Sequence, residues 1–496
     1  MLKKLATETA LYGLSSMVGR MLNFLLITLY THHFYGFAPQ EYGALTYFYT
    51  YVAFLNIIFV YGLETAFFRY ANKTDKPLEV YNLLLSYLII STFFFTIILY
   101  SFSDWLVSFS KFPAQGYILR WIAIILAVDT LLALPYSRLR FEKKARWFVL
   151  TKLGNILITI FLNIFFLVIC REIYDGKILP TFRDTISSFY NPAFGVGYVF
   201  LANLIANTLN ILWLYACFID FRFRFNWQVF RPILSYAYPL ALMGLAGIVS
   251  QLVANLLIPI YLPDNFYEGR SALYALGIYG ACFKLSVLMS LAIQSFKYAA
   301  EPFFFSKAQD KNSPALFAKV MYYFVVVCVL LWLGVCLNLF WIKDFVIPNK
   351  RYHEGLGIVP ILLLANLFLG MYYNFSFWFK ITEKTYYGTW ISVAGAVFTV
   401  IFNIILIPIF GYVACAWVTL ASYAGMAWVC YAWGQKFYPV PYQILPILAH
   451  IFLGGILIII SNYLPKSLNF WATLAINFTL FVVYLSYVFF TEKQKR

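Results

Sequence analysis

The stretch LYGLSSMVGRMLNFLLITLY, residues 11–30, is long and apolar enough to cross a bilayer, yet it holds a full positive charge, Arg20, near its middle. In the other half of the chain, LYALGIYGACFKLSVLMSLAIQ at 273–294 holds Lys284 in the same way. A charge at mid-bilayer is costly unless it faces a partner or a water-filled cavity. We therefore expect both cations to line one anion-binding cavity. The alternative is that each forms a structural ion pair with an acidic residue of another helix.

The composition of the chain predicts an all-α polytopic membrane protein. Hydrophobic residues make up 63% of the 496 residues and charged residues only 11%, whereas a soluble domain has about 25% charged residues. The net charge of +16 does not indicate nucleic acid binding, because basic residues of membrane proteins collect in cytoplasmic loops. The seven cysteines form no CxxC pair and indicate neither a disulfide set nor a metal site.

Fourteen stretches have the roughly 20 mostly apolar residues that a membrane-spanning helix needs. They cover residues 10–31, 42–69, 80–105, 117–137, 147–170, 194–219, 232–262, 271–300, 316–342, 355–380, 386–408, 411–434, 443–464 and 467–490. The division between the eleventh and twelfth stretches rests on Pro408 and Gly411, which favour a tight turn over one long helix. The first stretch lacks an A-x-A cleavage site, so we expect it to be a retained helix.

The loops and a weak internal repeat predict the organisation of these spans. Most lysines and arginines outside the spans lie in the N-terminus, the C-terminus and every second loop, which predicts that both termini are cytoplasmic. LLITLY at 25–30 recurs as LLIPIY at 256–261, and each copy ends the first helix of a half. This pattern indicates a parallel repeat. We expect two six-helix lobes, 1–225 and 226–435, followed by two further helices and a cytoplasmic tail in 436–496.

The deepest charges are the strongest candidates for function. Arg20 belongs to a polar stripe of its helix, because Tyr12, Ser16, Gly19 and Asn23 recur at helical spacing. Asn23 is therefore a further candidate substrate ligand. Asp129 lies near the middle of the fourth span. It either neutralises Arg20 or carries a coupling sodium ion or proton, since a buried carboxylate can have a raised pKa.

Three other charged residues lie nearer to helix ends and have ordinary explanations. Lys152 can extend its ammonium to the cytoplasm, Lys297 can pair with Glu301, and Glu64 can pair with Arg69. The alternative is that they rim the cytoplasmic mouth of the cavity. Lys152 and Lys297 would then bind substrate, and Glu64 would take part in ion coupling.

Five segments carry a family resemblance through their order and spacing. They are ETALYGLSSMVGRMLNFLLITLYTHHF (8–34), PQEYGALT (39–46), YGLETAFFRYA (61–71), PYSRLRFEKKAR (135–146), and LGIYGACFKL with SFKYAAEPFF (276–304). With them, the chain resembles the polysaccharide transporter family of O-antigen and capsule repeat-unit flippases. That family belongs to the superfamily that also holds multidrug and toxin extrusion pumps and lipid II flippases.

The resemblance implies a V-shaped transporter of two six-helix lobes plus two C-terminal helices. It implies alternating access, and transfer of a polyprenyl-diphosphate-linked oligosaccharide from the cytoplasmic to the outer leaflet of the bacterial inner membrane. Arg20 and Lys284 lie in the helices that match the family's diphosphate-binding helices. The last two helices form a lipid-tail groove in lipid II flippases, and 436–496 would correspond to them. The implied partners are the lipid-linked glycan, membrane lipid and a glycan polymerase or ligase, with the transporter itself a monomer.

Two other functions are compatible with the residues. A cation-coupled drug or metabolite antiporter of the same fold is supported by Asp129, whereas Arg20 argues against a cavity for cationic drugs. A membrane enzyme would be expected to have a large outer loop, and the longest one, 171–193, is short. The chain has no HExxH, Walker A or GxSxG motif in a suitable context. We therefore expect no enzymatic activity, no metal and no organic cofactor, with coupling to Na⁺ or H⁺ left open.

Overall fold

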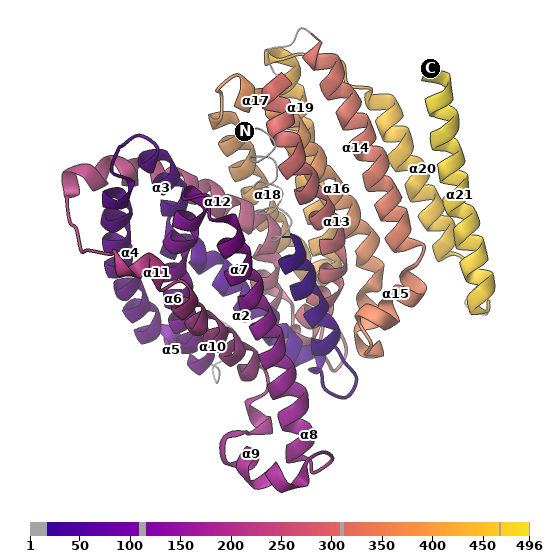
Figure 1. The fold of residues 1–496 in the computed structure, drawn as a ribbon. Helices are drawn as coiled ribbons and strands as arrows, with labels where there is room; N and C mark the ends of the chain where they lie inside the picture. Colours follow the sequence, from indigo (N-terminus) through magenta and orange to yellow (C-terminus); the bar gives the residue numbers. More distant parts are fainter. Residues whose placement is uncertain (1–16, 109–115, 308–311, 466–467, 496) are drawn as a thin grey trace. The chain divides into compact units, whose positions relative to one another are not determined.

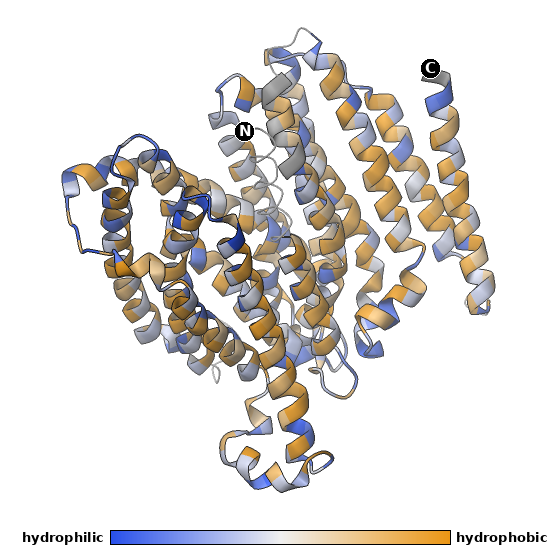
Figure 2. Ribbon diagram, viewed as in Figure 1, coloured by the Kyte–Doolittle hydropathy of each residue, from blue (hydrophilic) through white to orange (hydrophobic). Residues whose placement is uncertain are grey.

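The computed structural model describes residues 17–108, 116–307, 312–465 and 468–495, and every regular element in these ranges is a helix (Figure 1). Twelve helices are long and apolar enough to cross a membrane. Two shorter apolar helices, Met17–Tyr30 and Gly197–Trp213, lie where the first and sixth spans are predicted. The all-α polytopic membrane fold is confirmed, and the count of fourteen spans stays a prediction. Figure 2 shows apolar residues along most of each long helix.

Contacts between residues divide the chain into two compact units: unit 1 is Met1–Gly280 with Ile407–Gly411, and unit 2 is Ala281–Leu406 with Tyr412–Arg496. Unit 1 contains the N-terminal helix Met17–Tyr30 and α2 (Pro39–Val60), α3 (Leu63–Ala71), α4 (Pro77–Ser101), α5 (Ser103–Ser108), α6 (Gly116–Phe141), α7 (Ala145–Ile164), the π-helical η2 (Phe165–Ile169), α8 (Cys170–Tyr174), η3 (Pro180–Phe182), α9 (Arg183–Phe189), η4 (Pro192–Phe194), α10 (Gly197–Trp213), α11 (Ala216–Ile219) and α12 (Trp227–Tyr261). Helix α13 (Ala272–Lys307) begins in unit 1 and continues into unit 2. Unit 2 contains α14 (Ser313–Cys336), α15 (Leu339–Val346), η5 (Lys350–Ile358), α16 (Val359–Phe375), α17 (Phe377–Ile381), α18 (Tyr386–Phe410) except its last turn from Ile407, α19 (Tyr412–Phe437), α20 (Ile444–Asn462) and α21 (Phe470–Lys495).

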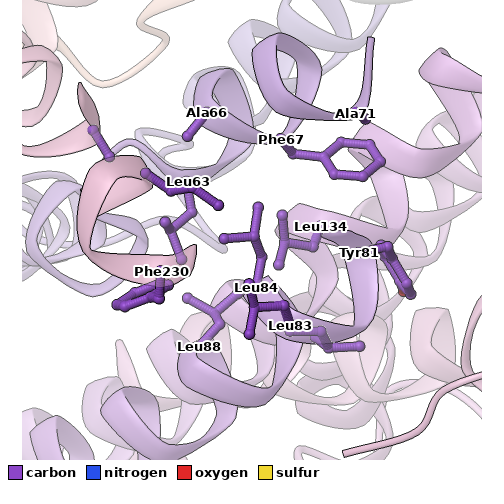
Figure 3. Packing of buried hydrophobic residues seen from close by; sticks show 13 residues of the cluster. Leu63, Ala66, Phe67, Ala71, Tyr81, Leu83, Leu84, Leu88, Leu134 and Phe230 are labelled. Carbon is purple, nitrogen blue, oxygen red and sulfur yellow. The ribbon is translucent and has the colours of Figure 1, made fainter. Parts of the chain in front are cut away.

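Helix α12 packs into the core of unit 1. Figure 3 shows Phe230 of α12 beside Leu63 of α3, Leu84 of α4 and Leu134 of α6, in a cluster that excludes solvent. The contact grouping thus places α12 in unit 1, whereas the repeat assigns it to the second lobe. The units are defined by contacts between residues and the lobes by the sequence repeat, so the one does not test the other. The predicted domain limits therefore stay a prediction.

Two glycines allow α2 to approach the first turns of α13 closely within unit 1. A Cβ atom at Gly277 would lie 1.9 Å from the carbonyl oxygen of Pro39. A Cβ atom at Gly43 would lie 2.0 Å from the carbonyl oxygen of Leu273. Small residues of this kind permit backbone-to-backbone packing of membrane helices.

The substitution Gly277→Ala is expected to lower the melting temperature of the purified protein, with a cost of about 1–3 kcal/mol, because the added methyl group forces α2 and α13 apart. Intrinsic tryptophan fluorescence during heating in detergent measures the change. Gly334→Ala in α14 is the matched control, since a Cβ atom there meets nothing within 4 Å. Equal melting temperatures of the two variants would contradict the close approach.

The two halves of the chain share local structure at corresponding helices. LLITLY and LLIPIY each end a helix, at Tyr30 and at Tyr261. A second pair of segments, TIFLNI from Thr159 and TVIFNI from Thr399, also matches. In each, the asparagine side chain donates to the threonine carbonyl one turn earlier, at 2.8 Å from Asn163 and 2.7 Å from Asn403. The same kind of bond also occurs at Asn72, Asn338, Asn366 and Asn374, so the repeat stays a prediction.

The tight turn predicted at 408–411 is present. Helix α18 ends at Phe410 and α19 begins at Tyr412. Gly411 has φ +61°, a left-handed backbone conformation that glycine adopts without a steric penalty.

The last two helices dock on α14 through buried polar groups in unit 2. The two ring nitrogens of His450 in α20 lie 2.9 Å from the hydroxyl of Tyr322 in α14 and 3.1 Å from that of Tyr484 in α21. Seven residues before Tyr484, Asn477 of α21 donates to the carbonyl oxygen of Leu337, the residue after α14, at 2.6 Å. Hydrogen bonds in an apolar environment are strong and directional. These bonds join α20 to α14 and to α21, and α21 to the residue that follows α14.

Candidate substrate and ion sites

A relay of amide groups holds the carboxylate of Asp129 inside unit 1. Asn155 of α7 donates to the side-chain oxygen of Asn207 in α10 at 2.8 Å, and Asn207 in turn donates to Asp129 of α6. Polar groups at membrane depth need such partners, because lipid offers none. The relay fixes the half-buried carboxylate at the place where α6, α7 and α10 meet.

Lys152 of α7 lies among the charged residues around this carboxylate. Its ammonium lies 4.7 Å from the ring centroid of Tyr136, and its side chain is exposed. It interacts electrostatically with Asp129, Glu64, Arg140 and Arg20.

The unit 1 charge cluster is defined by these residues, which come from the N-terminal helix, α3, α6 and α7: Arg20, Glu64, Asp129, Arg140 and Lys152. The cluster holds three cations and two carboxylates, an excess of one positive charge when all five are ionised. The cluster can therefore attract an anion, and its carboxylates can bind a proton or a small cation. Lys152 was predicted either to reach the cytoplasm or to bind substrate. In the structure, other cations and two carboxylates lie close enough to act on its charge.

Glu64 forms an ion pair with Arg140 of α6, at 3.0 Å, and not the expected helix-end pair with Arg69. Arg69 instead lies 4.0 Å from the ring centroid of Tyr236. Glu64 and Arg69 are five residues apart, which puts them on different faces of an α-helix with 3.6 residues per turn. Glu64 is thus tied to the charge cluster through Arg140.

Arg20 and Asn23 share an exposed face of the N-terminal helix. Arg20 lies ten residues before the helix end at Tyr30, or about 15 Å along the helix at 1.5 Å per residue. The hydroxyl of Tyr30 donates to Asn163 of α7 at 3.0 Å and fixes this helix end. Two other members of the predicted stripe, Tyr12 and Ser16, lie outside the described residues.

Lys284 and Lys297 lie on α13 in unit 2. Lys284 is twelve residues after the start of α13 at Ala272, or about 18 Å along the helix. Its side chain is exposed, and within the described ranges it has no ion-pair or hydrogen-bond partner. The half-buried Lys297 places its ammonium 4.7 Å from the ring centroid of Tyr373. The side chain of Glu301, its expected partner, lies outside the described residues.

The two central cations belong to different units, Arg20 to unit 1 and Lys284 to unit 2. That both line one cavity stays a prediction.

The sequence analysis missed the amide relay. Asn155 and Asn207 each appear as single polar residues in apolar stretches, and nothing in the chain pairs them with Asp129 across three helices. A signal was present in α10, where Asn203, Asn207 and Asn210 follow one another at spacings of four and three. Such a stripe of amides on one helix face indicates a polar contact inside the membrane domain.

Comparisons with known proteins agree with the fold. Residues 37–175 match a family model described as polysaccharide biosynthesis protein. The structure of lipid II flippase MurJ in an inward closed conformation is 15% identical with a TM-score of 0.67, covering 98% of this chain and 100% of that one. No curated relative matches the chain.

Two structures of a multidrug resistance MATE family transporter of the MOP superfamily are also similar. The inward-facing one is 14% identical with a TM-score of 0.63, covering 88% of this chain and 96% of that one. The outward-facing one is 14% identical with a TM-score of 0.58, covering 90% and 96%. At these identities the likeness concerns the fold, which is that of membrane transporters and flippases. The resemblance drawn from the sequence agrees with these findings: the chain shares its fold with the lipid II flippase and MATE transporter structures, and its residues 37–175 match a family model described as polysaccharide biosynthesis protein.

Proposed function

We propose that this multi-pass membrane protein is a flippase that moves a polyprenyl-diphosphate-linked oligosaccharide from the cytoplasmic to the outer leaflet by alternating access. The observation that carries the proposal is Lys284, an exposed cation about 18 Å into an apolar helix with no carboxylate within ion-pair distance among the described residues. A cation kept at that depth without an acid suits an anionic ligand, because fixed positive charge offsets the cost of bringing a diphosphate into a low-dielectric layer.

The remaining predicted residues take the following roles in the proposal. Arg20 and Asn23 bind the headgroup from the N-terminal helix, and Lys152 and Lys297 guide it from positions nearer the helix ends. Asp129 and Glu64 bind the coupling proton or sodium ion. The positive excess of the unit 1 charge cluster supports the first role, and the amide relay to Asp129 supports the second.

The proposal includes the setting in which the protein works. We infer that it is a monomer in a bacterial inner membrane, with both termini cytoplasmic, and that it hands its product to a glycan polymerase or ligase. The excess of lysine and arginine in alternate loops supports this orientation.

A drug or metabolite antiporter of the same fold is the second candidate. It is supported by the MATE transporter structures and by the carboxylate of Asp129. The positive excess around Asp129 weighs against a cationic drug, because like charges repel it from the cluster.

Proteoliposomes that contain the purified protein distinguish the two functions. A polyprenyl-diphosphate oligosaccharide with an oxidisable sugar is placed in the inner leaflet, and its arrival outside is measured with a membrane-impermeant oxidant. We expect arrival to be faster than in protein-free liposomes, and we expect no uptake of ethidium against an ion gradient. Gradient-driven ethidium transport without lipid transfer would establish the antiporter and refute the flippase.

A further inference from the structure

An apolar groove of about 330 Å³ lies between α18 and α19, within unit 2. Five residues of α18 and seven of α19 line it, and Ser422 is the only hydroxyl-bearing residue among them. The Ser422 hydroxyl is already engaged, since it donates to the carbonyl oxygen of Gly395 at 3.2 Å and accepts from Thr399 at 3.0 Å. The groove therefore suits a hydrocarbon chain and not a sugar or an ion.

The shape of the groove limits the length of its occupant. Deep in the hairpin, α18 and α19 touch, because a Cβ atom at Gly395 would lie 2.5 Å from the sulfur of Met426. At Gly425 the groove is open, and a Cβ atom there would meet nothing within 4 Å. The lining spans eight residues of α18, from Trp390 to Phe398, or about 12 Å, and twelve residues of α19, from Ala421 to Trp433, or about 18 Å, so the groove runs through only part of a hydrocarbon core of about 30 Å.

The mouth of the groove has the composition of a membrane–water interface. Trp390 lies close to the start of α18 and Trp433 close to the end of α19, and tryptophan prefers this interface. Lys384 reaches across the mouth from one helix to the other, since its ammonium lies 3.8 Å from the ring centroid of Phe437. Lys436 is exposed three residues after Trp433 and shares its helix face.

The charge at the mouth is positive. Residues 380–384 carry two lysines and one glutamate, and Lys436 adds a third cation. Basic residues beside an intramembrane groove attract the phosphate of a lipid headgroup. Apolar lining, interfacial tryptophans and basic residues thus follow one another along one direction, as the tail, ester region and phosphate do in a phospholipid.

We propose that the α18–α19 groove is a binding site for an anionic phospholipid, with one acyl chain between the helices and the phosphate at Lys384 and Lys436. The extent of the groove favours a resident phospholipid over the polyprenyl tail of a transported substrate. A groove that ends inside the membrane, with its cations at one mouth, fits a lipid whose headgroup stays at that mouth, whereas a substrate tail moves to the other leaflet. The proposal goes beyond the flippase function and does not depend on it.

Native mass spectrometry of the purified full-length protein, titrated with dioleoyl phosphatidylglycerol or dioleoyl phosphatidylcholine, tests the groove. We expect wild-type protein to bind one phosphatidylglycerol in preference to phosphatidylcholine. Gly425→Leu fills the open groove and is expected to weaken this binding about tenfold. Gly334→Leu in α14 is the matched control, because its new side chain also enters open space but lies outside the groove. Undiminished binding to Gly425→Leu would overturn the proposal.

A second variant distinguishes the contribution of the lipid headgroup to binding from that of the acyl chain. With Lys384→Gln and Lys436→Gln together, the preference for phosphatidylglycerol is expected to fall about thirtyfold, while phosphatidylcholine binds as before. A matching loss of the lipid-induced rise in melting temperature is expected, since a ligand that binds only the folded state stabilises it. An unchanged lipid preference would overturn the headgroup assignment. Displacement of phosphatidylglycerol from the wild type by a polyprenyl monophosphate at equal concentration would overturn the choice of a resident phospholipid.

Discussion

Replacing Lys284 by alanine is expected to abolish glycan export in cells and to lower lipid transfer in proteoliposomes by about tenfold to a hundredfold, the value of one or two charge-assisted hydrogen bonds. The side chain is exposed, so its removal leaves no cavity and the protein should fold and insert normally. The measurement is the initial rate at which the labelled lipid-linked oligosaccharide reaches the outer leaflet.

The substitution series at this position separates charge from shape. Lys284→Arg should retain more activity than Lys284→Gln, because only arginine keeps the positive charge. Arg20→Lys and Arg20→Gln form the parallel pair in unit 1, with the same expected order. Lys73→Ala, in the exposed loop between α3 and α4, is the control for loss of a lysine elsewhere. Wild-type rates for Lys284→Ala or Lys284→Gln would remove Lys284 from the mechanism.

Asp129→Asn is expected to remove the dependence of transport on an ion gradient. The asparagine keeps the size of the side chain and an oxygen that can accept from Asn207, but it loses the negative charge that would bind a proton or sodium ion. The transport rate of the wild type should be higher with an imposed sodium or proton gradient than without one. The rate of the variant should be the same in both conditions, and about tenfold lower than that of the wild type with the gradient.

Asp75→Asn is the matched control, because Asp75 is exposed in the loop before α4. It should keep the wild-type response to both gradients. If Asp129→Asn responded to the gradients as the wild type does, the carboxylate would have a structural role, and the coupling site would have to lie elsewhere.

The sequence predicted the parts of this fold that depend on local chemistry. Apolar stretches of sufficient length become helices wherever they occur, because lipid leaves the backbone no other way to satisfy its hydrogen bonds. The turn at Gly411 was predictable because glycine alone adopts positive φ without a penalty. The fifth span was predicted at 147–170, and the helix begins two residues earlier, at Ala145. It continues through the π-helical η2 as far as Tyr174, four residues beyond the predicted end.

The parts that were missed depend on which helices become neighbours. Glu64 has a nearby arginine in the sequence, Arg69, but its partner is Arg140, a residue 76 positions away. Asn207 reaches Asp129 across 78 positions in the same way. Hydropathy is a property of one segment, so it carries no information about the pairing of polar groups between segments. The candidate residues could be identified by depth and charge, but their partners required the tertiary structure.

The docking of α20 and α21 on α14 has a consequence for biosynthesis. Tyr322 hydrogen-bonds His450, and the carbonyl oxygen of Leu337 accepts from Asn477, so both bonds involve helices that the ribosome makes last. Until α20 and α21 have been inserted, Tyr322 of α14 and Leu337, which follows α14, lack these two hydrogen bonds. The contacts that join α20 and α21 to α14 can thus form only when synthesis of the chain is nearly complete.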